Sequence, residues 1–81
     1  MQTIKTIDSL FYRELGKKLR HAREYRNITL KELSKKTGYS RALHDHWELG
    51  FNKIRPEQLE RTCKALQIPN NLKVDIELKI L

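Results

Sequence analysis

The strongest constraint on the fold is the segment TLKELSKKTGYSRALHDHWELG at residues 29–50. Thr29, followed three positions later by Glu32, forms a capping-box pattern that is typical of a helix N-terminus. Gly38 suits the left-handed residue that ends a helix, and Ser40 is a suitable N-cap for the next one. The segment therefore predicts two short helices joined by a tight glycine turn.

The second of these helices should end at Gly50, and Leu43 with Trp47 forms an apolar i,i+4 pair on it. A loop then leads to Pro56, which suits the first position of another helix. Its inner face should carry Leu59, Cys63 or Thr62, and Leu66, and the turn residues Pro69-Asn70-Asn71 should close it.

Apolar residues also recur at intervals of three and four ahead of this segment, which predicts a long amphipathic helix ending near Arg26. Its start is open, because Thr3, Asp8 and Ser9 are all suitable N-caps. Residues 1–8 are therefore either an extension of the helix or an N-terminal arm. The stripe consists of Ile4, Ile7, Phe11, Leu15, Leu19 and Ala22.

The C-terminal segment, residues 72–81, alternates apolar and charged residues, which is typical of a strand with one buried face. A single strand needs a partner, and either the N-terminal arm or the same strand of a second copy can supply it. We expect a dimerisation strand, with a short fifth helix or a frayed end as the alternative. Its apolar positions are Leu72, Val74, Ile76, Leu78 and Ile80.

The 81 residues suffice for a single domain, residues 1–81, with a modest core. Seventeen Lys and Arg against ten Asp and Glu give a net charge of +7, which favours a polyanionic partner. A chain this short has little room for a substrate pocket, so we do not expect an enzyme. One cysteine and no long apolar run predict a soluble cytoplasmic protein rather than a secreted or membrane protein.

Residues 16–68 resemble the Cro/repressor-type helix-turn-helix proteins, also called the XRE family. The resemblance rests on Gly16-Lys17-Lys18-Leu19-Arg20 with Ala22-Arg23, on Thr29-x-x-Glu32-Leu33, on Gly38-Tyr39-Ser40, on Trp47-Glu48-x-Gly50, and on the Leu59…Leu66 helix. It implies an all-α, lambda-repressor-like bundle of four to five helices, here with the C-terminal β-strand added. It also implies that the helix after Ser40 enters the major groove of DNA.

The resemblance assigns roles to particular residues. Base-reading positions are Ser40, Arg41, Ala42, Asp45 and His46. Arg41 can bond to the O6 and N7 atoms of guanine, and Ala42 can contact a thymine methyl group. Phosphate-binding positions are Thr29, Lys31, Asn52, Lys53 and Arg55.

Arg23 and Glu48 are expected to form a partly buried structural ion pair rather than DNA contacts. The sequence departs from the family in three places. Residues 72–81 do not resemble its usual fifth helix, so the family's dimer contacts do not carry over. Leu30 stands where a glutamine usually binds phosphate, and His44 stands where Ile or Val usually faces the core. His44 is then either buried and neutral or turned outward.

No metal, cofactor or catalytic site is expected. His44 and His46 are two residues apart on a helix, so they point to different sides and cannot share one ion. The leading hypothesis is a dimeric operator-binding regulator, expected to be a repressor, of phage, mobile-element or restriction–modification type. The alternative is an antitoxin that binds a partner toxin and regulates its own promoter. A membrane-surface helix fits poorly.

Overall fold

The computed structural model describes residues 2–72, and describes side chains from residue 9 onward. This part of the chain contains four helices and no strand, so the expected all-α bundle is confirmed. The helices are α1 (Gln2–Tyr25), α2 (Leu30–Thr37), α3 (Arg41–Leu49) and α4 (Pro56–Leu66).

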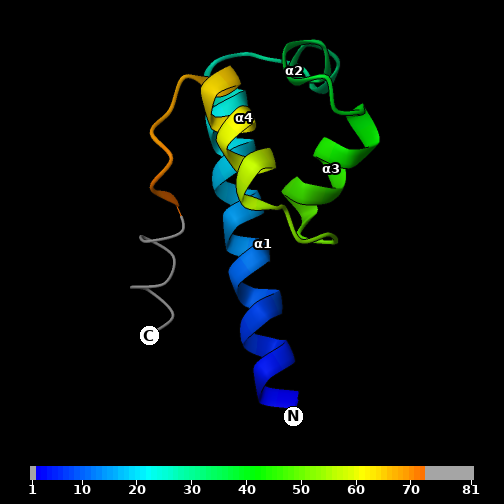
Figure 1. Ribbon diagram of the computed structural model, residues 1–81, viewed down its shortest axis with the longest axis vertical. Coiled ribbons are helices and arrows are strands. Elements are labelled where there is room, and N and C mark those ends of the chain that lie inside the picture. The colour runs from blue at the N-terminus through cyan, green and yellow to red at the C-terminus, as the bar shows by residue number, and fades with distance from the viewer. Residues whose placement is uncertain (1, 73–81) are drawn as a thin grey trace.

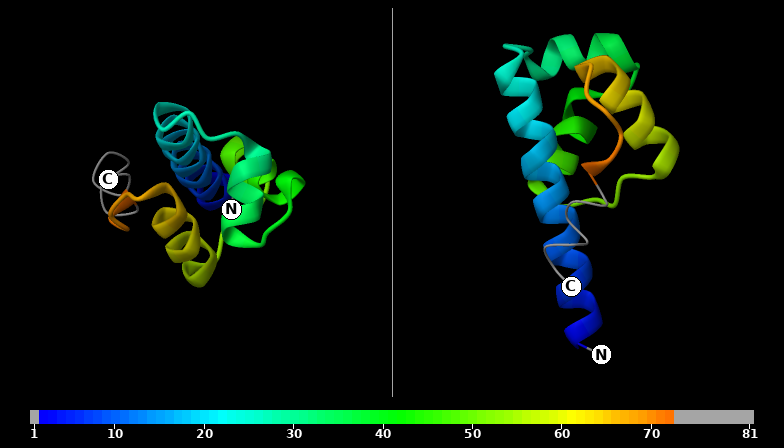
Figure 2. Two further views of the ribbon diagram at one scale, coloured as in Figure 1. Left: turned by 90° about the horizontal axis from the view of Figure 1, so that it is seen from above. Right: turned by 90° about the vertical axis from the view of Figure 1, so that its left-hand side faces the viewer.

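Helix α1 is the longest element; α3 and α4 pack against it, and α2 packs against α3 and α4 (Figure 1). It starts at Gln2, so residues 2–8 extend the helix and do not form a separate arm. Figure 2 shows the N-terminal end of α1 projecting beyond the other helices, while α4 lies along its opposite end. Helices α2 and α3 lie together on one side of this scaffold (Figures 1 and 2).

The core lies where all four helices meet. Leu15 and Leu19 contribute the α1 stripe, and Trp47 contributes the inner face of α3. The predicted inner face of α4 is confirmed, and both candidates for its middle position, Thr62 and Cys63, are buried. The buried apolar residues are Leu15, Leu19, Leu33, Trp47, Ile54, Leu59, Cys63 and Leu66.

Gly16 is the point of closest approach between α1 and α3. A Cβ atom placed on it would lie 2.3 Å from the Trp47 carbonyl oxygen and 2.4 Å from that of Glu48. Only a residue without a side chain allows the two backbones to come this close. This contact sets how deeply α3 is seated against α1.

The end of α4 differs from the prediction. The helix begins at Pro56 as expected, but it ends at Leu66, before the Pro69-Asn70-Asn71 turn. Gln67 adopts a left-handed conformation with φ 57°, and Arg26 Nη2 donates a hydrogen bond of 3.0 Å to its carbonyl oxygen. The Gln67 N–H bonds to the carbonyl oxygens of Cys63 and Lys64, so Gln67 is the left-handed C-cap of α4, a role that its residue type does not predict.

The predicted dimerisation strand lies almost entirely outside the described residues. Its first residue, Leu72, packs against the core of its own chain. Val74, Ile76, Leu78 and Ile80 are not among the described residues, so the strand and its role stay predictions.

Candidate nucleic-acid interface

Helices α2 and α3 are defined by local capping contacts. Thr29 Oγ1 accepts a hydrogen bond from Glu32 N, and Glu32 Oε1 accepts one from Thr29 N, which completes the predicted capping box. Ser40 Oγ accepts from Leu43 N at 3.1 Å and so caps α3. Gly38, with φ 85°, makes the left-handed turn between the two helices. The two-helix unit predicted from the sequence is confirmed.

A shallow concave surface lies between the N-terminal ends of α2 and α3. Its volume is about 520 Å³, and it opens to solvent rather than forming a closed cavity. It is lined by Thr29, Leu30, Lys31, Arg41, Ala42 and Asp45. Apart from Leu30, these residues are ones that the resemblance assigns to DNA contacts, and the fold brings them together.

The expected base-reading residues stand clear of the core. Arg41, Ala42 and His46 are exposed, and Asp45 is half-buried one helical turn after Arg41. The His46 ring lies beside Phe51 in a tilted arrangement, with 5.8 Å between the ring centroids. Ser40 is also exposed, but its oxygen is used in capping α3, so a base contact would come in addition to that hydrogen bond.

The N-terminus of α2 carries a carboxylate of its own. Hydrogen bonds from Thr29 lower the pKa of Glu32, so this side chain stays ionised at the positive end of the helix dipole. Two backbone N–H groups, those of Thr29 and Glu32, are thereby used within the chain. The N–H groups of Leu30 and Lys31, which have no carbonyl partner within the helix, are left as donors for a phosphate.

The loop after α3 presents three of the expected phosphate-binding residues. Asn52, Lys53 and Arg55 are exposed, while Ile54 between them is 3% exposed and anchors the loop in the core. Lys53 Nζ lies 5.9 Å from the centroid of the Tyr12 ring on α1. One buried apolar side chain thus holds a polar loop beside the C-terminal end of α3.

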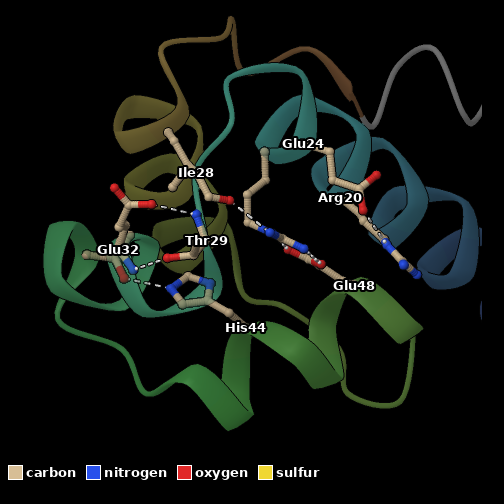
Figure 3. Close-up of polar contacts among 9 residues, drawn as sticks. Arg20, Glu24, Ile28, Thr29, Glu32, His44 and Glu48 are labelled. Carbon is tan, nitrogen blue, oxygen red and sulfur yellow. Dashed lines mark hydrogen bonds and ion pairs between the residues drawn. The ribbon is translucent and has the colours of Figure 1, made fainter.

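Arg23 and Glu48 form a two-pronged ion pair between α1 and α3. Arg23 Nε donates to Glu48 Oε2 at 2.7 Å, and Nη2 donates to Oε1 at 3.0 Å. Arg23 Nη1 also donates to the Ile28 carbonyl oxygen at 2.8 Å, and the bond with Glu48 raises the pKa of Arg23. These bonds link α1, the α1–α2 connection and α3, and Figure 3 shows the two partners Ile28 and Glu48 on either side of the contact. Both side chains are largely buried, so the geometry supports a structural role.

His44 is buried within the two-helix unit and does not turn outward. It is 2% exposed (Figure 3 shows its ring turned toward α2), and its Nε2 lies 2.6 Å from Oγ1 of Thr37, the last residue of α2. Burial, assisted by the positive charge of Arg23, lowers the pKa of His44 to about 4. The ring is therefore neutral at neutral pH.

Two residues that support this site cannot be assigned a role from the sequence alone. No local sequence pattern around Thr37 predicts a role for it, because its partner His44 is seven positions away. Gly16 belongs to a motif of the family resemblance, but that motif does not predict its packing role. Its close contact with α3 is a matter of helix packing, which apolar periodicity does not reveal.

No three His, Cys, Asp or Glu side chains gather as metal ligands within the described residues. The described helices are also too short or too polar to cross a membrane.

A family model described as a helix-turn-helix domain matches residues 14–73. The chain belongs to this helix-turn-helix domain family. Its members are XRE-type DNA-binding domains, so the resemblance to the Cro/repressor type is confirmed, and membership supports DNA binding and transcription regulation. Neither the curated proteins nor the solved structures compared with this helix-turn-helix domain include a significant match.

Proposed function

We propose that the protein binds duplex DNA sequence-specifically as a small dimeric transcriptional regulator, with α3 in the major groove. The supporting observation is the exposure of Arg41 and Ala42 on the first turn of α3, beside Lys31 at the start of α2. The opposite side of α3 is buried through His44 and Trp47, so the exposed side is free to enter a groove about 12 Å wide.

The proposed base readers act in different ways. Arg41 donates two hydrogen bonds to a guanine, and Ala42 contacts a thymine methyl group. Asp45 accepts a hydrogen bond from a cytosine amino group or orients Arg41 from one turn away. His46 reaches a base or a phosphate near the C-terminal end of α3.

The proposed phosphate contacts surround this helix. Lys31 and the N–H groups at the start of α2 bind one stretch of backbone. Asn52, Lys53 and Arg55 bind another, beyond the C-terminal end of α3. Thr29 contributes through its hydroxyl hydrogen, because its N–H donates to Glu32 and its hydroxyl oxygen only accepts from Glu32 N.

Selection of bound duplexes from a random pool tests sequence readout. Wild type should enrich a near-palindrome with half-site centres about 34 Å apart or a multiple of that. Arg41→Ala should lose one preferred base at a fixed position, at a cost of about 1–3 kcal/mol for the cognate site. Lys64→Ala, which removes an exposed positive charge on α4, is the matched control and should keep the full preference. An unchanged preference in Arg41→Ala would remove this residue from the readout.

Sizing of the pure protein and titration with salt test the dimer. A homodimer that neutralises roughly six to ten phosphates should show a log–log slope of affinity against salt of about −5 to −9. A monomer that pairs only with the product of a neighbouring gene would instead favour the antitoxin alternative, in which residues 72–81 add to the sheet of a toxin.

A further inference from the structure

Thr37 and His44 form a buried polar pair between the two helices of the helix-turn-helix. Thr37 is the last residue of α2 and is 3% exposed, and His44 lies in the middle of α3. The His44 ring is enclosed by aromatic neighbours, with centroids 5.3 Å from Trp47 and 6.0 Å from Tyr39.

The hydrogen bonds made by Thr37 Oγ1 determine which tautomer His44 adopts. A hydroxyl group has one hydrogen to donate and two lone pairs to accept with. Thr37 donates its hydrogen to the Leu33 carbonyl oxygen at 3.0 Å. One lone pair accepts from Tyr39 N at 3.2 Å. With the hydroxyl hydrogen directed at Leu33, the other lone pair accepts from His44, whose Nε2 then carries a hydrogen.

This contact ties the N-terminal half of α3 to α2. Glu48 with Arg23, and the close approach of Gly16, both secure the C-terminal half of α3. Within the described residues, His44 is the position nearest the first turn of α3 that bonds to another helix. It lies three residues after Arg41, on the next turn.

We propose that His44, in its neutral Nε2–H form, is a positioning residue that sets the angle between α2 and α3 through Thr37. It thereby places Arg41 and Ala42 for base readout. This role rests on the proposed DNA-binding function. A hydrogen bond has a preferred direction, whereas an apolar contact between the same helices permits sliding and rotation. Discrimination between base sequences depends on that placement more than attraction to phosphates does.

Nuclear magnetic resonance tests the tautomer directly. In a long-range ¹H–¹⁵N correlation spectrum at neutral pH, Nε2 of His44 should show the shift of a protonated ring nitrogen, and Nδ1 that of an unprotonated one. The reverse assignment, or averaged shifts for the two nitrogens, would overturn the proposal. This measurement requires no DNA, so it separates failure of the hydrogen bond from failure of DNA binding.

Two matched pairs of variants test the positioning role. His44→Gln keeps an N–H donor the same number of bonds from Cβ, whereas His44→Leu removes it. Thr37→Ser keeps the hydroxyl, whereas Thr37→Val removes it in nearly the same volume. Each variant is checked for folding by circular dichroism and then titrated with the selected duplex and with a random duplex of equal length.

We expect the two variants that lack the hydrogen bond to lose about tenfold or more in affinity for the selected duplex. Their affinity for the random duplex should change less than threefold, because the phosphate contacts remain. His44→Gln and Thr37→Ser should recover most of the selectivity. Should His44→Leu not fold, the comparison of Thr37→Val with Thr37→Ser decides. Full selectivity in folded variants without the bond, or equal losses on both duplexes, would refute the positioning role.

Discussion

Replacing Gly16 with alanine in α1 should destabilise the protein, although helix propensity alone predicts the opposite. Glycine in a helix interior is about 1 kcal/mol less favourable than alanine, so the substitution would strengthen an isolated α1. In the folded protein the new Cβ would lie 2.3 Å and 2.4 Å from the carbonyl oxygens of Trp47 and Glu48. These oxygens belong to the backbone of α3 and cannot rotate away.

The size of the effect follows from the separation that the helices would need. Ordinary contact with a Cβ begins near 3.4 Å, so α1 and α3 must move apart by about 1 Å. Overpacking of this kind typically costs 1–3 kcal/mol, and the backbone contact places Gly16→Ala at the upper end of that range. After the gain in helix propensity, we expect a net loss of about 2 kcal/mol, which lowers the Tm of a domain of this size by about 10 °C.

Thermal and urea unfolding, followed by circular dichroism and by Trp47 fluorescence, measure this loss. The protein concentration is held constant, because the stability of a dimer depends on it. His21→Ala, on the exposed side of α1, is the control and should change stability by less than about 0.5 kcal/mol. A Gly16→Ala protein as stable as wild type, or more stable, would refute the inferred contact between α1 and α3.

Two further predictions concern buried polar groups. Arg23→Met should cost about 3 kcal/mol, because it leaves the Glu48 carboxylate buried without a partner, and adding Glu48→Leu should restore most of the stability. A folded double mutant that specifically loses DNA binding would instead make Arg23 a DNA contact. His44 gives a pH dependence. Its pKa is lowered from 6.5 to about 4, so the unfolded chain binds this proton first and stability falls as the pH drops through that interval. Wild type should lose about 2 kcal/mol more than His44→Gln between pH 7 and pH 5, measured by urea unfolding. Parallel losses in the two proteins would contradict the buried neutral ring.

The sequence by itself determined where α2 and α3 begin and end. Thr29 and Ser40 cap the helices through hydrogen bonds that span three residues, and Gly38 supplies a left-handed turn. These interactions are complete within one helical turn, so neighbouring residues suffice to predict them. The exposed face of α3, with Arg41 on it, follows from the same local boundaries and the helical period.

Only the tertiary structure decided how these helices are held against the rest of the bundle. Gly16 matters because the backbone of α3 lies against it, and Arg26, directly after α1, bonds to the Gln67 carbonyl oxygen at the end of α4. Thr37 and His44 contact each other from two different helices, and His44 is neutral because it is buried away from water. Each of these effects depends on the distance between segments far apart in the chain, and side-chain packing sets that distance.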